Sequence, residues 1–154
     1  MRVVIVAVGK PREAALAAAI TEYETRAARY WPLDVYEVRE EGARGTPPAQ
    51  VRDREGERLL ARVPAGADVI ACDAGGDAMR SEAFAEWLQR KRESARSVAL
   101  LIGGAFGLSD AVLSQAKSRL AVAPWTLPHE LARLVLAEQL YRAGTIIRGE
   151  PYHK

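Results

Sequence analysis

The sequence has a single cysteine, few aromatic residues and no long apolar run. Cys72 is the only cysteine among 154 residues and stands between apolar neighbours, which excludes a disulfide-stabilised fold and predicts a reducing compartment. The opening apolar run, Val3–Val8, ends after six residues, whereas a membrane span needs about 18. No basic segment precedes it as in a secretory leader. We therefore expect a cytoplasmic protein with no membrane partner.

Neither sign of charge dominates, and no metal-ligand spacing is present. The 22 basic and 20 acidic side chains leave a net charge of +2, which is too small to indicate a nucleic-acid partner by itself. No Cys/His cluster predicts a metal site, and no Ser/His/Asp order indicates a hydrolase. The composition is 49% hydrophobic and 27% charged, as in ordinary globular proteins, so we expect one domain over residues 1–154.

Strand-length apolar runs alternate with segments of helical period. The patterns predict five strands, at 3–8, 33–39, 68–73, 98–102 and 121–123. They also predict five helices. Three of these are at 11–30, 51–62 and 129–147, one begins after Ser81 as its N-cap, and one runs from its N-cap Ser109 to residue 120. This order favours an α/β fold with a mostly parallel sheet flanked by helices. The more polar strand 33–39 is expected near an edge. Since ligands bind beyond the carboxyl ends of such strands, the informative residues should follow strands three, four and five.

Glycine pairs follow the third and fourth predicted strands, within Asp73–Asp77 and Gly103–Gly107. Paired glycines allow a backbone to approach a ligand closely, or they form tight turns. The second segment is not a dinucleotide fingerprint, because Ile102 occupies a position that needs glycine. The stiff segment 124–129 starts and nearly ends with proline. It either presents backbone polar groups to a flat ligand such as adenine or simply connects a strand to the last helix.

The last helix and the tail carry charged and proton-exchanging side chains. Glu138 and Arg142 are four residues apart, so their side chains lie on the same face of the predicted helix. They could form either a catalytic pair or an ordinary solvated ion pair. Tyr152 and His153 can exchange protons or stack on a base, although terminal residues are often frayed. His129 is as consistent with a structural histidine as with a ligand. The residues alone leave these alternatives open.

Motifs along the whole chain resemble the RlmH family of SPOUT-class methyltransferases, which modify N3 of a pseudouridine in 23S ribosomal RNA of the large subunit. The matching segments are Val6–Lys10, Thr21–Tyr23, Leu100–Leu108, Thr126–His129, Leu136–Arg142 and Arg148–Lys154. The resemblance implies a C-terminal trefoil knot, a homodimer and the cofactor S-adenosylmethionine held in the knot. It also implies ribosomal RNA as the partner, with action on the assembled ribosome.

The resemblance also places roles on residues of this chain. The implied cofactor-binding residues are Cys72, Asp73, Gly103, Gly104, Ala123, Pro124, Trp125, Thr126, Leu127 and Pro128. We expect the catalytic residues to be Glu138, Arg142, Tyr152 and His153, and the substrate-binding residues to be Arg44, His129 and Arg133. The chain departs from many relatives at Ala105, Phe106 and Trp125, where the rim of the pocket would be reshaped.

Two other functions fit parts of the pattern. The first is a doubly wound enzyme that binds a nucleotide or flavin, although the early turn at Gly9–Pro11 lacks the glycine set that cradles a phosphate. The second is a non-catalytic RNA-binding module, in which the glycine pairs and the tail would have no chemical role. Binding of S-adenosylmethionine would distinguish the methyltransferase from both.

Overall fold

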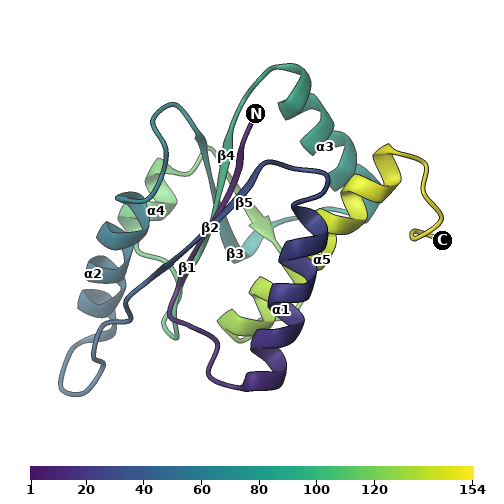
Figure 1. The fold of residues 1–154 in the computed structure, drawn as a ribbon. Coiled ribbons are helices and arrows are strands. Elements are labelled where there is room, and N and C mark those ends of the chain that lie inside the picture. The colour runs from purple at the N-terminus through teal and green to yellow at the C-terminus, as the bar shows by residue number, and fades with distance from the viewer.

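A five-stranded parallel sheet forms the centre of the computed structural model, which describes residues 1–154 (Figure 1). Its strands are β1 (Val3–Val8), β2 (Leu33–Val38), β3 (Asp68–Ala78), β4 (Val98–Ile102) and β5 (Ser118–Ala121). They lie in the order β2-β1-β4-β3-β5, and every neighbouring pair is parallel. The predicted α/β fold is confirmed, as is the edge position of β2. The C-terminal trefoil knot stays a prediction.

Helices cover both faces of the sheet. They are α1 (Ala14–Ala27), α2 (Pro48–Leu60), α3 (Ser81–Glu93), α4 (Asp110–Gln115) and α5 (His129–Ile147). In Figure 1, α1, α3 and α5 lie on one side of the sheet and α2 and α4 on the other. No helix is both long enough and apolar enough to span a membrane.

The interior strand β1 lies between β2 and β4, and its position explains its continuous apolar run. Val3 and Ile5 belong to the core beneath α1, α3 and α5, whereas Val4 and Val6 belong to the core beneath α2 and α4. Successive strand residues point to opposite faces, so a strand covered on both faces needs apolar residues at every position. All six residues of β1 are buried.

Several predicted boundaries are wrong. β3 continues to Ala78 instead of ending at Asp73, because its last residues pair with β5 after a register shift between Cys72 and Asp77. Pairing with β3 also draws Leu120 into β5, so the fourth helix ends at Gln115 and the fifth strand lies earlier than predicted. The second helix begins at Pro48, where a proline suits the first turn.

One of the two predicted serine caps is correct. Ser109 precedes α4, and its side chain accepts a hydrogen bond from the backbone N–H of Val112 at 3.3 Å. Ser81 is instead the first residue of α3, with Arg80 at the N-cap position. Its hydroxyl donates to Oε1 of Gln139 at 2.8 Å, so Ser81 links α3 to α5.

Candidate cofactor and substrate site

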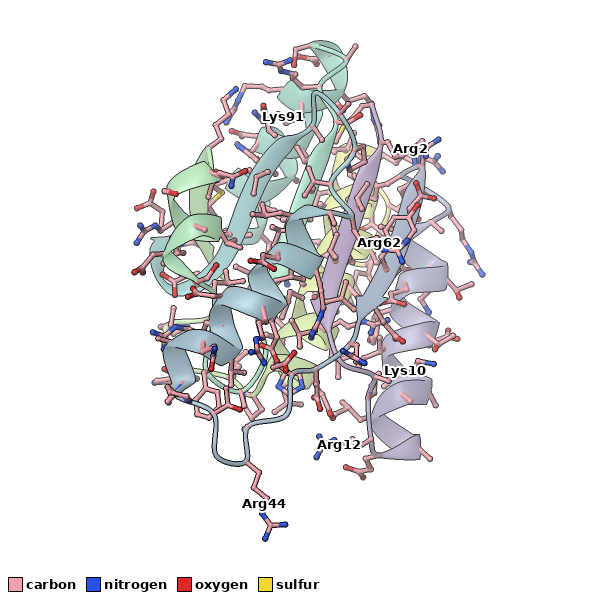
Figure 2. The ribbon with its side chains drawn as sticks, turned by 90° about the vertical axis from the view of Figure 1, so that its left-hand side faces the viewer. Arg2, Lys10, Arg12, Arg44, Arg62 and Lys91 are labelled. Carbon is pink, nitrogen blue, oxygen red and sulfur yellow. The ribbon has the colours of Figure 1, made fainter.

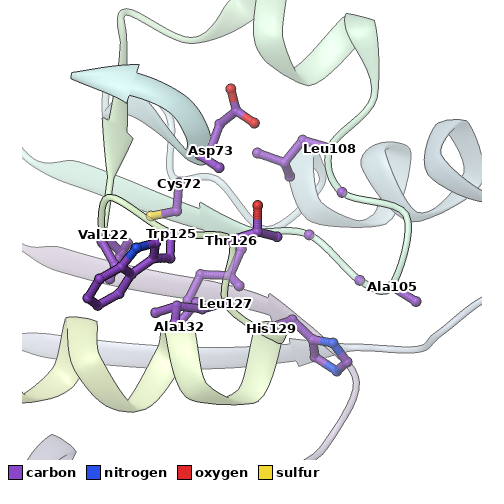
Figure 3. A pocket seen from close by; sticks show the side chains of 16 residues that line it. Cys72, Asp73, Ala105, Leu108, Val122, Trp125, Thr126, Leu127, His129 and Ala132 are labelled. Atoms are coloured by element: carbon purple, nitrogen blue, oxygen red, sulfur yellow. The ribbon is translucent and has the colours of Figure 1, made fainter. Parts of the chain in front are cut away.

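The strand order brings three segments distant in sequence to one edge of the sheet. β4, β3 and β5 are neighbours and run in the same direction, so the residues that follow them meet. Together they line a cavity of about 180 Å³, termed here the cofactor cavity (Figure 3). Its 16 lining residues, 10 of them hydrophobic, come mainly from 72–74, 102–108 and 122–127. The expectation that the loops after strands three, four and five converge is met.

Eight of the ten expected cofactor-binding positions line the cofactor cavity: Cys72, Asp73, Gly103, Gly104, Ala123, Trp125, Thr126 and Leu127. Pro124 and Pro128 belong to the same loop but are not part of the lining. Trp125 stands at the rim with 77% of its surface exposed. Sequence analysis missed Ile102, Leu108, Val122 and Ala132. Ile102 and Leu108 lie within the matching segment 100–108, and Val122 precedes the expected segment 123–128, whereas nothing in the sequence distinguishes Ala132.

The two glycines after β4 are required by the packing of the chain against itself. A Cβ atom on Gly103 would lie 2.6 Å from the carbonyl carbon and oxygen of Gly107. A Cβ atom on Gly104 would lie 2.8 Å from Oε2 of Glu55, a residue of α2. The contact of Gly103 with Gly107 agrees with the expected tight turn. Close approach of a ligand at the same glycines stays a prediction.

Cys72 contributes a neutral wall to the cofactor cavity. It follows Ala71 in β3, and its sulfur points toward the cavity side of the strand (Figure 3). Burial raises the pKa of the Cys72 thiol to about 12, so the thiolate needed for nucleophilic attack is absent near neutral pH. Cys72 therefore serves as a lining residue and not as a nucleophile.

The tail is anchored on α5 instead of being frayed. Oε1 of Glu138 accepts hydrogen bonds from Nε of Arg142 at 3.0 Å and from the hydroxyl of Tyr152 at 3.0 Å. The Arg142 guanidinium also lies 4.7 Å from the centroid of the Tyr152 ring, within cation–π range. Glu138, Arg142, Tyr152 and His153 thus form one connected group, termed here the tail cluster.

Hydrogen bonding in the tail cluster defines the proton positions. Nδ1 of His153 is 3.3 Å from Nη1 of Arg142, and Nε2 is 3.2 Å from Oε1 of Glu82. Arginine can only donate, so Nδ1 is assigned as the acceptor and Nε2 carries the hydrogen. Burial, together with contacts to Tyr23 and Glu138, raises the pKa of Tyr152 well above its usual value. Tyr152 is therefore a hydrogen-bond donor near neutral pH.

The tail cluster and the cofactor cavity are separate within one chain. His129 and Ala132 of α5 line the cavity, whereas Glu138 lies six residues beyond Ala132 on the same helix, or about 9 Å at 1.5 Å per residue. No residue of the tail cluster is part of the cavity lining. Figure 1 shows the tail turning back beside the C-terminal half of α5. A single chain therefore does not bring the expected catalytic residues to its own cofactor cavity.

Arg133 and Arg44 were both expected to bind substrate, but only one of the two guanidinium groups is exposed and free to contact it. Arg133 is only 6% exposed, with Nε donating to Glu24 at 2.8 Å and Nη1 to Glu37 at 2.7 Å. Its guanidinium thus ties α5 to α1 and β2 and lies outside the cavity lining, which argues against the expected substrate contact. Arg44 projects from the tip of the loop between β2 and α2 into solvent (Figure 2).

Replacing Arg133 with methionine should lower the free energy of unfolding by about 2–4 kcal/mol, since Glu24 and Glu37 lose their shared cation and remain as partly buried carboxylates. Urea denaturation measures this change. The matched control is Arg29→Met, at an exposed position whose side chain makes no ion pair in the structure. An Arg133→Met protein as stable as the control would show that the ion-pair network is not structural.

Comparison with known proteins gives consistent matches over the full length. The model of the family described as "Predicted SPOUT methyltransferase" matches residues 1–153. The ribosomal RNA large subunit methyltransferase H of Gemmatimonas aurantiaca is 64% identical over 154 residues, and that of Anaeromyxobacter sp. (strain Fw109-5) is 51% identical, each with 100% of both chains covered.

A solved structure, that of the SpoU methyltransferase AviRb from Streptomyces viridochromogenes in complex with AdoMet, aligns with 96% of this chain and 58% of its own. Its identity is 18% and its TM-score 0.45. The chain belongs to the SPOUT methyltransferase family and, within it, to the ribosomal RNA large subunit methyltransferase H proteins.

Proposed function

We propose that this chain is an S-adenosylmethionine-dependent methyltransferase that methylates N3 of a pseudouridine in 23S ribosomal RNA. The observation that carries the proposal is the convergence of the segments after β3, β4 and β5 on one cavity. The relatives are named as methyltransferases of large-subunit ribosomal RNA, which supplies the class of substrate. Such an enzyme works where ribosomes are, in the cytoplasm.

The lining of the cofactor cavity suits S-adenosylmethionine. Ile102, Leu108, Val122 and Leu127 provide apolar surface for a flat purine. Residues 123–127 offer backbone N–H and C=O groups for its polar edge, because this segment lies outside every helix and strand. When bound, the cofactor supplies a methyl group activated by a sulfonium. The protein must then position the base and help its N3 proton to leave.

The tail cluster provides groups for that second task. Arg142 remains charged beside Glu138, whose hydrogen bond raises the pKa of the guanidinium. A fixed cation stabilises the negative charge that an imide develops as N3 loses its proton. Tyr152 donates a hydrogen bond and His153 has an exchangeable ring proton, so both can contact the carbonyl groups or relay the proton. Glu138 positions Arg142 and Tyr152.

A homodimer would bring these groups to a cofactor cavity. Between the tail cluster and the cavity lies a groove lined by Phe84, Val122 and Val135, with Met79 and Leu131 of the same region 38% and 40% exposed. Exposed apolar surface of this kind marks association sites. A second copy packed on this face in a two-fold dimer would place its tail near the cavity of the first.

The assembled ribosome fits the modest charge of the chain. Binding to free RNA through phosphates alone requires many cations, whereas this chain has a net charge of +2. Arg44 and the α2 residue Arg52 are candidate RNA contacts. Arg54 and Arg58 are less available because both pair with Glu41.

Mass spectrometry of 23S ribosomal RNA from cells that lack this protein tests the proposal. We expect the N3-methylated pseudouridine to disappear and to return when the wild-type chain is supplied. Purified protein should methylate intact ribosomes from such cells and leave free large subunits unmodified. An unchanged level of the modified nucleoside would reject the substrate, and methylation of free subunits alone would reject the assembled ribosome.

A further inference from the structure

A second cavity adjoins the cofactor cavity on the side of β1 and β2. Its volume is about 370 Å³, and its ionisable lining residues are Arg12, Glu40, Glu41, Glu55, His129 and Glu130. Ala105 and His129 line both cavities. Gly104 lines the cofactor cavity. Because glycine has no side chain, the carboxyl group of Glu55 can pack directly against it. We term this second cavity the acidic annex.

Glu55 is buried in the annex with one oxygen unpaired. The residue is 3% exposed, and its Oε1 accepts a hydrogen bond from the backbone N–H of Glu41 at 3.0 Å, whereas its Oε2 is buried without a partner. Burial raises the pKa of Glu55, because the cost of removing the carboxylate from water outweighs the hydrogen bond from the Glu41 N–H. A buried polar atom without a partner is costly and indicates a bound group that completes it.

The neighbouring carboxylates already have partners. Glu40 accepts a hydrogen bond from Arg12 at 2.7 Å, and Glu41 pairs with Arg54 and Arg58. Glu55 is therefore the acid of the annex that is free to bind a cationic group.

His129 supplies a second unpaired atom. Its Nε2 is buried without a hydrogen-bond partner, since the nearest carboxylate oxygens, on Glu40 and Glu130, lie 3.8 and 3.9 Å away. The annex thus presents an unpaired carboxyl and an unpaired ring nitrogen. A ring N–H binds an anion and a carboxylate binds a cation, so the two atoms match the two ends of an amino-acid zwitterion.

We propose that the acidic annex binds the amino-acid end of S-adenosylmethionine, with Glu55 accepting hydrogen bonds from its α-ammonium and His129 Nε2 donating to its α-carboxylate. This inference rests on the proposed function. The cofactor cavity alone, at about 180 Å³, is smaller than ligand pockets of roughly 300–1,000 Å³. The annex provides the additional room, and its acidic lining suits the cationic half of the ligand.

Calorimetry with three related probes tests the proposal on the full chain. S-adenosylmethionine and S-adenosylhomocysteine carry the amino-acid end, whereas 5′-methylthioadenosine lacks it. Glu55→Gln keeps the size of the side chain and an acceptor for the Glu41 N–H but removes the negative charge. We expect this variant to bind the first two probes at least about tenfold more weakly and to bind methylthioadenosine as the wild type does.

The matched control is Glu57→Gln, which removes the same charge from an exposed position of α2 and should leave all three affinities unchanged. Unchanged methylthioadenosine binding also verifies that the Glu55 variant is folded. Wild-type affinity of Glu55→Gln for S-adenosylmethionine would overturn the inference. So would an equal loss for all three probes, because Glu55 would then only support the loop at Gly104. A wild-type chain that binds none of the probes would instead reject the proposed function.

Discussion

Replacing Gly103 with alanine should weaken the binding of S-adenosylmethionine by at least about 100-fold. The new Cβ atom would lie 2.6 Å from the carbonyl carbon and oxygen of Gly107, closer than non-bonded atoms approach. These are backbone atoms at the end of a tight loop, so relief requires the loop to move and not merely a side chain. That loop forms one wall of the cofactor cavity, and its displacement removes several contacts at once. Calorimetry with the cofactor measures the loss.

Gly66→Ala is the matched control for Gly103→Ala. A Cβ atom at Gly66 would meet nothing within 4 Å, and Gly66 precedes β3, at the end of the sheet away from both cavities. Its positive φ of 76° strains an alanine there, so this variant should be less stable but should bind the cofactor as the wild type does. The sheet itself should persist in Gly103→Ala, because the steric conflict lies beyond the end of β4. A cooperative urea transition would confirm a folded protein. If the alanine variant is folded and binds the cofactor normally, the loop after β4 is not part of the binding site.

The sequence predicted the elements of the fold better than their ends. Val3–Val8 and Val98–Ile102 have the expected bounds because strands buried on both faces are recognisable from their continuous apolar composition. The bounds of β3 and β5 were wrong because Leu120 pairs with both Cys72 and Asp77 across a register shift, which draws Asp77 and Leu120 into strands. Such pairing joins segments that are far apart in sequence, so the strand propensity of each local segment does not predict it.

The loop residues of the candidate site and His129 of α5 were predicted from the sequence, whereas the helix residues Glu55 and Ala132 were missed. The loops at Gly103 and Thr126 could be found because glycine pairs and prolines mark backbone with special roles. Glu55 could not be found, because in the sequence it resembles the exposed acidic residues around it, such as Asp53 and Glu57. Only the packing of α2 against the loop at Gly104 shows that it is buried.

Deleting Pro151–Lys154 should lower the methylation rate by about 10²–10⁴-fold, the usual contribution of positioned acid–base groups, while affinity for S-adenosylmethionine stays unchanged. The deletion removes Tyr152 and His153 from the tail cluster but no residue that lines the cofactor cavity. Rate assays on ribosomes that lack the modification, together with calorimetry, measure the two effects separately. Removing Lys154 alone, which is exposed and outside the cluster, should change neither. Full activity of the longer deletion would exclude Tyr152 and His153 from the mechanism.

If the chain forms the proposed homodimer, mixed dimers test whether the tail of one subunit completes the cavity of the other. Gly103→Ala has an intact tail and a damaged cavity, whereas the deletion variant has the reverse. If the tail of one subunit completes the site of the other, a mixed dimer contains one site in which both parts are intact. Random reassociation of equal amounts puts half of the dimers in this form, so activity should return to about a quarter of the wild-type value. If each tail serves its own subunit, no site is complete and the mixture stays inactive. No residue of the tail cluster lines the cofactor cavity of its own chain, which favours the first result.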